Sequence, residues 1–145
     1  SISDGAAAVV LSRESVAKAN GQQPVAKIVA MAAHAQEPAQ FTVAPIGAIE
    51  KVLDKAGWSA DEVELWEVNE AFACVAMFAM RDIGIPHDKI NVNGGGTALG
   101  HPIGASGTRI IVTLLNALKQ QGKKRGVASL CIGGGEATAV AVELV

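Results

Sequence analysis

One stretch of the chain, residues 91–107, limits the possible folds more than any other because six of its positions are glycine. A glycine in a helix interior costs about 1 kcal/mol relative to alanine, and a glycine in a strand has no side chain to pack. Glycine instead allows a positive φ angle and a close approach of the backbone to another group. A single histidine, His101, stands among these glycines and is followed by Pro102, which suits the first position of a helix. We therefore interpret the stretch as a functional loop that leads into a helix.

The composition is that of one α/β domain and argues against several functional classes. Half of the 145 residues are hydrophobic but only 3% are aromatic, so small residues fill the core, as in closely packed sheets. The net charge of −2 gives no reason to expect nucleic acid or an anionic membrane as a partner. No apolar run reaches the ~18 residues of a membrane span. Cys74 and Cys131 do not indicate a disulfide framework, and we expect a reducing, cytoplasmic setting.

Hydrophobic periodicity predicts strands that alternate with helices. Apolar runs of strand length occupy residues 6–11, 25–33, 65–68, 90–92, 127–132 and 138–144. Between them, periodic spacing with glycine and proline signals predicts helices over residues 13–20, 46–56, 69–83 and 109–119. We expect Ser12 and Asn69 to cap two of these helices, and glycines 133–135 to close an antiparallel hairpin. The alternation favours a mixed sheet, mostly parallel with an antiparallel last strand, and helices on both of its faces.

His101 is the first candidate for chemistry. Its structural alternative is a helix cap, but apolar packing does not explain the glycines around it or Pro102 after it. A histidine can take a proton from a thiol or hydroxyl, and it can donate a hydrogen bond to a carbonyl oxygen that gains negative charge. We therefore weigh function above structure at this position.

Cys131 and Asn69 are the other two candidates. Cys131 ends a predicted strand just before three glycines, whose backbone N–H groups can point at an anion. Cys74, by contrast, lies in the middle of a predicted helix and is interpreted as a small buried residue. Asn69 follows the predicted strand 65–68, and α/β sheets present ligands at the carboxyl ends of their strands. Glu70 is interpreted as answering the dipole of the helix that follows.

Other kinds of site fail on their spacing. The run that starts at Gly94 has Leu99 where a dinucleotide-binding fingerprint needs its last glycine. No phosphate-binding Gly-x-x-x-x-Gly-Lys-Ser/Thr occurs, and the sequence around Ser106 lacks the Gly-x-Ser-x-Gly of a nucleophile elbow. The cysteines and histidines show no zinc-ligand spacing, so we expect no metal site.

Three motifs taken together resemble the C-terminal half of the thiolases. They are Asn69-Glu70-Ala71-Phe72-Ala73, Gly100-His101-Pro102-Ile103-Gly104-Ala105-Ser106-Gly107 and Cys131-Ile132-Gly133-Gly134-Gly135. The opening Ser3-Asp4-Gly5-Ala6-Ala7-Ala8 is similar to the strand with which that half begins. The resemblance covers essentially the whole chain and, within the family, is closest to the acetyl-CoA acetyltransferases. It implies a layered thiolase-like fold with a five-stranded mixed sheet, with residues 1–145 as one C-terminal domain.

The resemblance also implies a reaction and catalytic roles. The reaction is a reversible Claisen condensation, in which two acetyl-CoA give acetoacetyl-CoA and free CoA. By matching position, Cys131 is the acid/base that removes the α-proton. His101 activates the nucleophilic thiol and forms an oxyanion hole with a water held by Asn69. The backbone N–H of Gly133 helps to stabilise the other oxyanion.

The same resemblance assigns the substrate pocket. Phe72 and Ile103 would line the channel for the acyl and pantetheine groups. The substrates are CoA thioesters, and no further cofactor is implied. Because a thioester α-proton is only weakly acidic, such chemistry needs a base beside hydrogen-bond donors that are already in place for the enolate oxygen.

One part of the family pattern has no match in this chain. The acylated cysteine of the family lies in its N-terminal half, so we expect the chain to be a piece of a longer protein and to be inactive alone. The expected partners are the N-terminal thiolase domain and further copies, in a homodimer or homotetramer.

Three alternatives stay open. The first is a non-catalytic thiolase-like module that binds acyl-CoA or lipid, and the second is a 3-ketoacyl-CoA thiolase that acts on longer acyl chains. The third is a ketoacyl synthase, although such enzymes carry a second histidine where this chain has Asn69.

Overall fold

A computed structural model describes all 145 residues and contains one four-stranded sheet. The strands are β1 (Ala26–Ala35), β2 (Leu65–Val68), β3 (Arg125–Ile132) and β4 (Glu136–Leu144). The α-helices are α1 (Glu14–Ala19), α2 (Ala44–Ala56), α3 (Ala73–Ile83), α4 (Gly96–Leu99) and α5 (Ser106–Gln121). Three 3-10 turns complete the structure: η1 (Pro38–Gln40), η2 (Ala60–Glu62) and η3 (His87–Lys89). No helix is long and apolar enough to cross a membrane.

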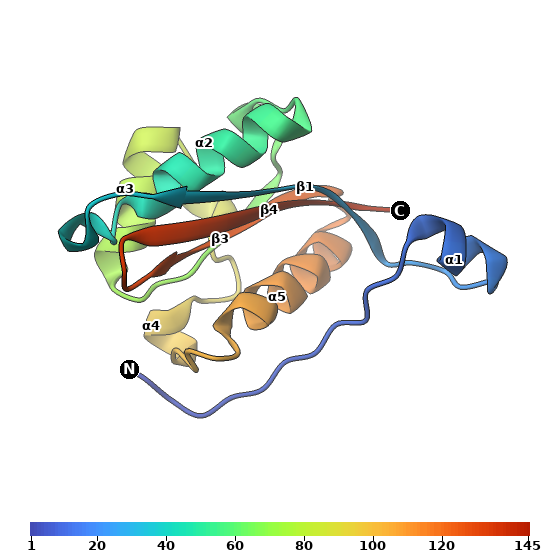
Figure 1. Cartoon of the computed structure of the whole chain (residues 1–145), viewed down its shortest axis with the longest axis horizontal. Helices are drawn as coiled ribbons and strands as arrows, with labels where there is room; N and C mark the ends of the chain where they lie inside the picture. The colour runs from blue at the N-terminus through green and yellow to red at the C-terminus, as the bar shows by residue number, and fades with distance from the viewer.

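The sheet is mixed, as expected, but its size and pairing differ from the prediction. Its strand order is β1-β4-β3-β2, and only the pair β2–β3 is parallel. The predicted hairpin of β3 and β4 is present, and β4 returns between β3 and β1 (Figure 1). Because both neighbours of β4 run against it, the sheet is mostly antiparallel rather than mostly parallel.

Two predicted strands do not form. Residues 6–11 are extended and exposed, with Val10 96% accessible, and Figure 1 shows the segment running past α5, away from the sheet. A strand needs a hydrogen-bonded neighbour, and residues 6–11 make no β-bridge; the bridge from Ile2 to His101 lies before them. Residues 90–92 make a single bridge, from Ile90 to Trp66, before Asn91 takes a positive φ of 47°. Of the six predicted strands four remain, so the sheet has four strands and not the five that the family resemblance implied.

The buried apolar residues form two clusters on opposite sides of the sheet. One joins α2 and α3 to sheet residues that include Trp66, Val68 and Cys131, and the other joins α5 to Leu65 and Ala128. Figure 1 shows α2 and α3 on one side of the strands and α5 on the other. Leu65 belongs to one cluster and Trp66 to the other because the pleat of a strand sends successive side chains to opposite faces of the sheet.

Several predicted helix ends lie elsewhere. Arg13 rather than Ser12 precedes α1, and Phe72 rather than Asn69 precedes α3. The last helix begins at Ser106, so Pro102 lies in the turn before it and not in its first turn. The ends of α2 and α5 are as expected, because Gly57 and Gly122 have the positive φ angles of helix-terminating glycines.

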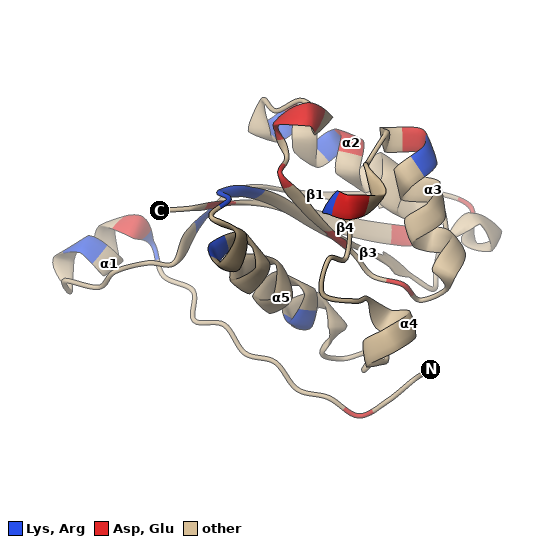
Figure 2. Ribbon diagram, turned by 180° about the vertical axis from the view of Figure 1, so that it is seen from behind, with Lys and Arg blue, Asp and Glu red and all other residues tan.

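Acidic and basic residues are mixed on three of the helices. Figure 2 shows acidic and basic residues side by side on α1, α2 and α3. On α1 these include an ion pair between Glu14 and Lys18, and on α3 one between Arg81 and Asp82. Exposed pairs of this kind contribute little to stability.

Candidate active site

His101 lies in the turn between α4 and α5 and is fixed through its backbone. Its N–H donates a hydrogen bond of 2.9 Å to the carbonyl oxygen of Ser1, beside the bridge to Ile2. Gly100, just before it, has φ 89°, a conformation that side chains other than glycine rarely adopt. The position of this histidine is therefore fixed both by the glycine stretch and by residues 1–2.

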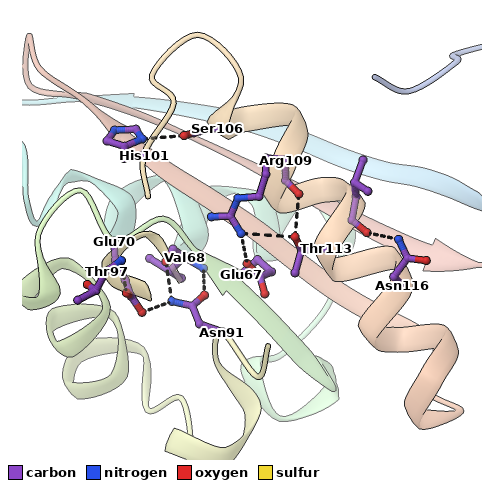
Figure 3. Close-up of polar contacts among 11 residues, drawn as sticks. Glu67, Val68, Glu70, Asn91, Thr97, His101, Ser106, Arg109, Thr113 and Asn116 are labelled. Carbon is purple, nitrogen blue, oxygen red and sulfur yellow. Dashed lines mark hydrogen bonds and ion pairs between the residues drawn. The ribbon is translucent and has the colours of Figure 1, made fainter. Parts of the chain in front are cut away.

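The His101 side chain contacts Ser106 at the start of α5. Its Nδ1 lies 2.6 Å from the Ser106 hydroxyl (Figure 3). The same hydroxyl donates to the carbonyl oxygen of Pro102 at 3.1 Å. Ser106 is completely buried. The other ring nitrogen, Nε2, makes no hydrogen bond within the chain and is not a buried atom. The imidazole is thus held on one side and open on the other.

Burial keeps the imidazole of His101 neutral. Partial desolvation lowers the pKa of His101 below its ordinary value, and the positive charge of Arg109 lowers it further. A neutral imidazole has a lone pair and is able to accept a proton.

Asn69 lies directly after β2, in the parallel register with β3. Its backbone N–H donates to the carbonyl oxygen of Ser129 at 2.9 Å, so the hydrogen-bond ladder of the sheet continues through it. Its side chain is buried, with the residue only 1% exposed, and neither amide atom has a hydrogen-bond partner in the chain. A buried amide of this kind is suited to hold a water molecule or a polar ligand group.

Glu70 joins the end of β2 to the glycine stretch. Its carboxylate accepts hydrogen bonds from the Asn91 side chain at 2.8 Å and from the Thr97 backbone at 3.0 Å (Figure 3). Although partial burial opposes the change, these hydrogen bonds lower the pKa of Glu70. A Cβ on Gly96 would lie 2.8 Å from the Glu70 carbonyl oxygen, so only glycine allows this approach. Glu70 therefore fastens the loop, a role different from the predicted interaction with a helix dipole.

Cys131 lies near the end of β3, opposite Ala137 of β4, and is 9% exposed. It belongs to the apolar cluster under α2 and α3. Burial raises the pKa of the Cys131 thiol, a hydrogen bond from its own backbone N–H partly offsets this rise, and the proximity of Cys74 adds a smaller increase. The thiol is therefore protonated at neutral pH, which suits a group that returns a proton.

Gly133 follows Cys131 in the three-glycine turn between β3 and β4. A Cβ built on Gly133 would meet no atom within 4 Å, so there is space for a ligand beside the backbone at this position. The turn is closed at its far end by the N–H of Gly135, which donates to the carbonyl oxygen of Ile132 at 3.1 Å.

The fold brings some of the predicted residues together. Asn69 follows β2 and Cys131 lies near the end of β3, the parallel neighbour of β2, so both are at the carboxyl end of this pair of strands. Glu70 ties the glycine stretch that leads to His101 against the same end. No hydrogen bond within the chain joins the side chains of His101, Asn69 and Cys131.

The two predicted substrate-lining residues are both exposed. Ile103, 63% exposed, faces an open hollow of about 410 Å³ between residues 3–7 and residues 102–105, next to His101. Phe72, 58% exposed, is not part of that hollow and packs edge-on against Phe41 with 6.0 Å between ring centres. Large exposed apolar side chains beside a site favour a ligand or a partner as their cover.

Two polar features were not assigned from the sequence. The first is Ser106, which we considered only as a nucleophile. The second is the buried pair of Glu67 on β2 and Arg109 on α5, whose Nη1 lies 3.4 Å from the carboxylate. Burial raises the pKa of Glu67 to about 7, against the attraction of Arg109. The sequence did offer one sign of this pair. Glu67 lies two residues after Leu65 in β2 and therefore on the same face, which α5 covers, where an apolar residue would be expected.

Comparison with known proteins agrees with these motifs. The family model described as the thiolase C-terminal domain matches residues 22–144. The chain belongs to the thiolase family. No group of three His, Cys, Asp or Glu side chains is arranged to hold a metal ion in this thiolase chain.

Individual thiolases match most of the chain but only part of themselves. The acetyl-CoA acetyltransferase of Allochromatium vinosum is 51% identical over 98% of the chain, and the cytosolic acetyl-CoA acetyltransferase of mouse is 48% identical over 98%. A solved thiolase of Ascaris suum in complex with coenzyme A is 39% identical, with a TM-score of 0.87 over 92% of the chain and 35% of that structure. The chain spans 36% of the length of the two curated relatives and corresponds to their C-terminal part.

Proposed function

We propose that this chain supplies the C-terminal half of the active site of an acetyl-CoA acetyltransferase. The full enzyme condenses two acetyl-CoA to acetoacetyl-CoA and CoA, or cleaves a 3-ketoacyl-CoA with CoA. The observation that carries the proposal is the buried, unpartnered amide of Asn69, tied through Glu70 to the loop of a neutral His101. The names of the relatives at about half identity support the same reaction.

In this proposal the chain's own residues handle protons and negative charge. His101 takes the proton of a nucleophilic thiol at Nε2 and, once protonated, donates from the same atom to a thioester oxygen. Asn69 holds a water that is the second donor to that oxygen. Cys131 is protonated at rest and gives this proton to the CoA thiolate that leaves in the first acyl transfer. The resulting Cys131 thiolate then removes the α-proton of the second acyl-CoA, and the N–H of Gly133 faces the other oxyanion.

The proposal also covers the rest of the protein. The chain is one C-terminal thiolase domain, and it works with an N-terminal domain that carries the acylated cysteine, in a homodimer or homotetramer. Ile103 and Phe72 contact the pantetheine and acyl groups, which is supported by the hollow at Ile103 and by the coenzyme A complex of the Ascaris relative. A cytoplasmic location is supported by the cytosolic mouse relative.

A chimera tests this function. The matched C-terminal part of the Allochromatium enzyme is replaced by this chain, and thiolysis of acetoacetyl-CoA is followed by its absorbance. We expect the chimera to be active, and Cys131→Ala to lower the rate by about 10²- to 10⁴-fold while an acetyl group still loads onto the enzyme. Cys74→Ser is the matched control and keeps the rate of the chimera. Equal rates for Cys131→Ala and Cys74→Ser would remove Cys131 from the mechanism.

A second reading of the same site is a thiolase for longer acyl chains. The exposure of Phe72 and Ile103 favours it, because both side chains offer apolar surface beyond an acetyl group. Rates of the chimera with 3-ketoacyl-CoA of increasing chain length separate the two. Highest kcat/KM for acetoacetyl-CoA supports the acetyltransferase, and a preference for longer chains supports the alternative. A chimera that binds CoA thioesters without turnover would support the non-catalytic module.

A further inference from the structure

Ser106 is the residue of the site that the proposed function leaves without a role. It is completely buried at the first position of α5, and its hydroxyl is 2.6 Å from Nδ1 of His101 (Figure 3). The hydroxyl is also 3.1 Å from the carbonyl oxygen of Pro102. The hydroxyl carries one hydrogen, so it can donate to only one of these two partners. The choice between them decides which nitrogen of His101 carries a hydrogen.

Two arrangements are possible. In the first, Ser106 donates to Pro102 and accepts a hydrogen bond from Nδ1–H of His101, which leaves a lone pair on Nε2. In the second, Ser106 donates to Nδ1, the bond to Pro102 is lost, and Nε2 carries the hydrogen. The separation of 2.6 Å is short for either direction, so the second contact of Ser106 decides. The first arrangement makes two hydrogen bonds where the second makes one.

We propose that Ser106 is a positioning residue that holds His101 in the Nδ1–H form, with the lone pair of Nε2 facing out of the chain. The accessibility of Nε2, which has no partner within the chain, agrees with this direction. The inference rests on the proposed role of His101 as a base, because only this tautomer accepts a proton at the open nitrogen. When Nε2 gains that proton, Nδ1–H stays bonded to Ser106, so the ring does not turn between its two tasks.

The contact is also suited to stabilise the protonated ring. Once Nε2 is protonated, Nδ1–H donates to the hydroxyl as a charged group, and hydrogen bonds from charged donors are stronger than those between neutral groups. Because Pro102 is connected to His101 by one peptide bond and Ser106 opens α5, the acceptor and the ring are fixed by the same short turn.

The tautomer can be read directly by NMR, without any reaction. In the ¹⁵N-labelled 145-residue chain near pH 8, long-range correlations of the imidazole separate protonated from unprotonated ring nitrogens, and the His101→Gln variant assigns the signals. We expect Nδ1–H to dominate in the unmodified chain. Ser106→Ala should change the ratio of the tautomers about fivefold toward Nε2–H, as the loss of one hydrogen bond implies.

Ser129 offers a matched control. It is also completely buried, and its hydroxyl donates to a backbone carbonyl, that of Thr138, at 2.8 Å, but it does not touch His101. Ser129→Ala should leave the tautomer ratio unchanged. Dominant Nε2–H in the unmodified chain, or equal shifts in the two alanine variants, would overturn the inference. Because no substrate is involved, an inactive chimera would end the proposed function and leave this result standing.

Discussion

The two proton-handling groups of the candidate site are held in different ways. Cys131 lies in a strand that is paired on both sides and packed under two helices, whereas His101 lies in a turn that a few polar contacts fix. Burial acts on both and moves their pKa values in opposite directions, up for the thiol and down for the imidazole. Desolvation always favours the neutral form, so each group rests uncharged. The candidate site thus has two parts. In the sheet side, which is the sheet with the helices packed on it, apolar packing fixes the residues. In the loop side, which is the glycine stretch with His101, hydrogen bonds fix them.

The largest effect is expected on the sheet side. Leu114 of α5 is fully buried against the sheet, and Leu114→Ala should lower the free energy of unfolding by about 2–5 kcal/mol, measured by urea denaturation. Leu115→Ala, one position along the same helix and only partly buried, is the control and should cost clearly less. Equal costs would mean that this helix does not pack as described.

The next largest effect is a pH dependence of the free energy of unfolding, caused by Glu67 on β2. Glu67 titrates at about 7 when folded and at 4.5 when unfolded, so its contribution to stability is complete below about pH 4.5 and is lost as the pH rises to 7. The loss amounts to about 3 kcal/mol, from 1.36 kcal/mol per unit of pKa. Glu67→Gln should flatten this part of the curve of unfolding free energy against pH.

Glu64 is the control, because folding shifts its pKa in the direction opposite to that of Glu67. Backbone hydrogen bonds from Arg125 and Lys124 lower the pKa of Glu64, so its contribution is present above pH 4.5 and is lost as the pH falls. Glu64→Gln should leave the slope between pH 4.5 and 7 in place. A slope that survives in Glu67→Gln would show that Glu67 does not cause it.

On the loop side, removal of one carboxylate should act locally. Glu70→Ala deprives Thr97 and Asn91 of their acceptor and should cost about 1–3 kcal/mol, with faster amide exchange at Thr97. Glu70→Gln keeps an acceptor oxygen and should lose less. Faster exchange spread over β3 as well would contradict the separation into two sides.

The smallest effect concerns the charge beside His101. Arg109→Met removes one of the causes that lower the pKa of His101, so the pKa should rise toward its ordinary value. It should stay below that value because burial, the larger cause, remains. An NMR titration of the His101 ring measures the change, with Lys119→Met at the far end of α5 as the control. A fall in the pKa would contradict the assignment.

The sequence predicted what depends on local patterns. Apolar runs and glycine signals were enough to predict the hairpin of β3 and β4, the end of α2 at Gly57, Asn69 directly after β2 and Cys131 near the end of β3. The prediction of a strand at residues 6–11 was wrong. An apolar run does not show which strand would pair with it, and no segment of this chain pairs with residues 6–11.

The polar contacts of the site could not be read from the sequence. The position of β4 between β1 and β3 depends on long-range pairing, and because of it the mixed sheet is mostly antiparallel and not mostly parallel as predicted. The contact between Ser106 and His101 and the hydrogen bond from the Thr97 N–H to Glu70 depend on the exact path of a glycine turn. The roles of His101 and Cys131 in catalysis stay predictions.

Exchange of the acetyl-CoA methyl hydrogens with deuterium from D₂O tests the central claim most directly. In the chimera described above, Cys131 as the base predicts exchange that NMR or mass spectrometry detects, and that disappears in Cys131→Ala but not in Cys74→Ser. Exchange that continues unchanged in Cys131→Ala would contradict the account.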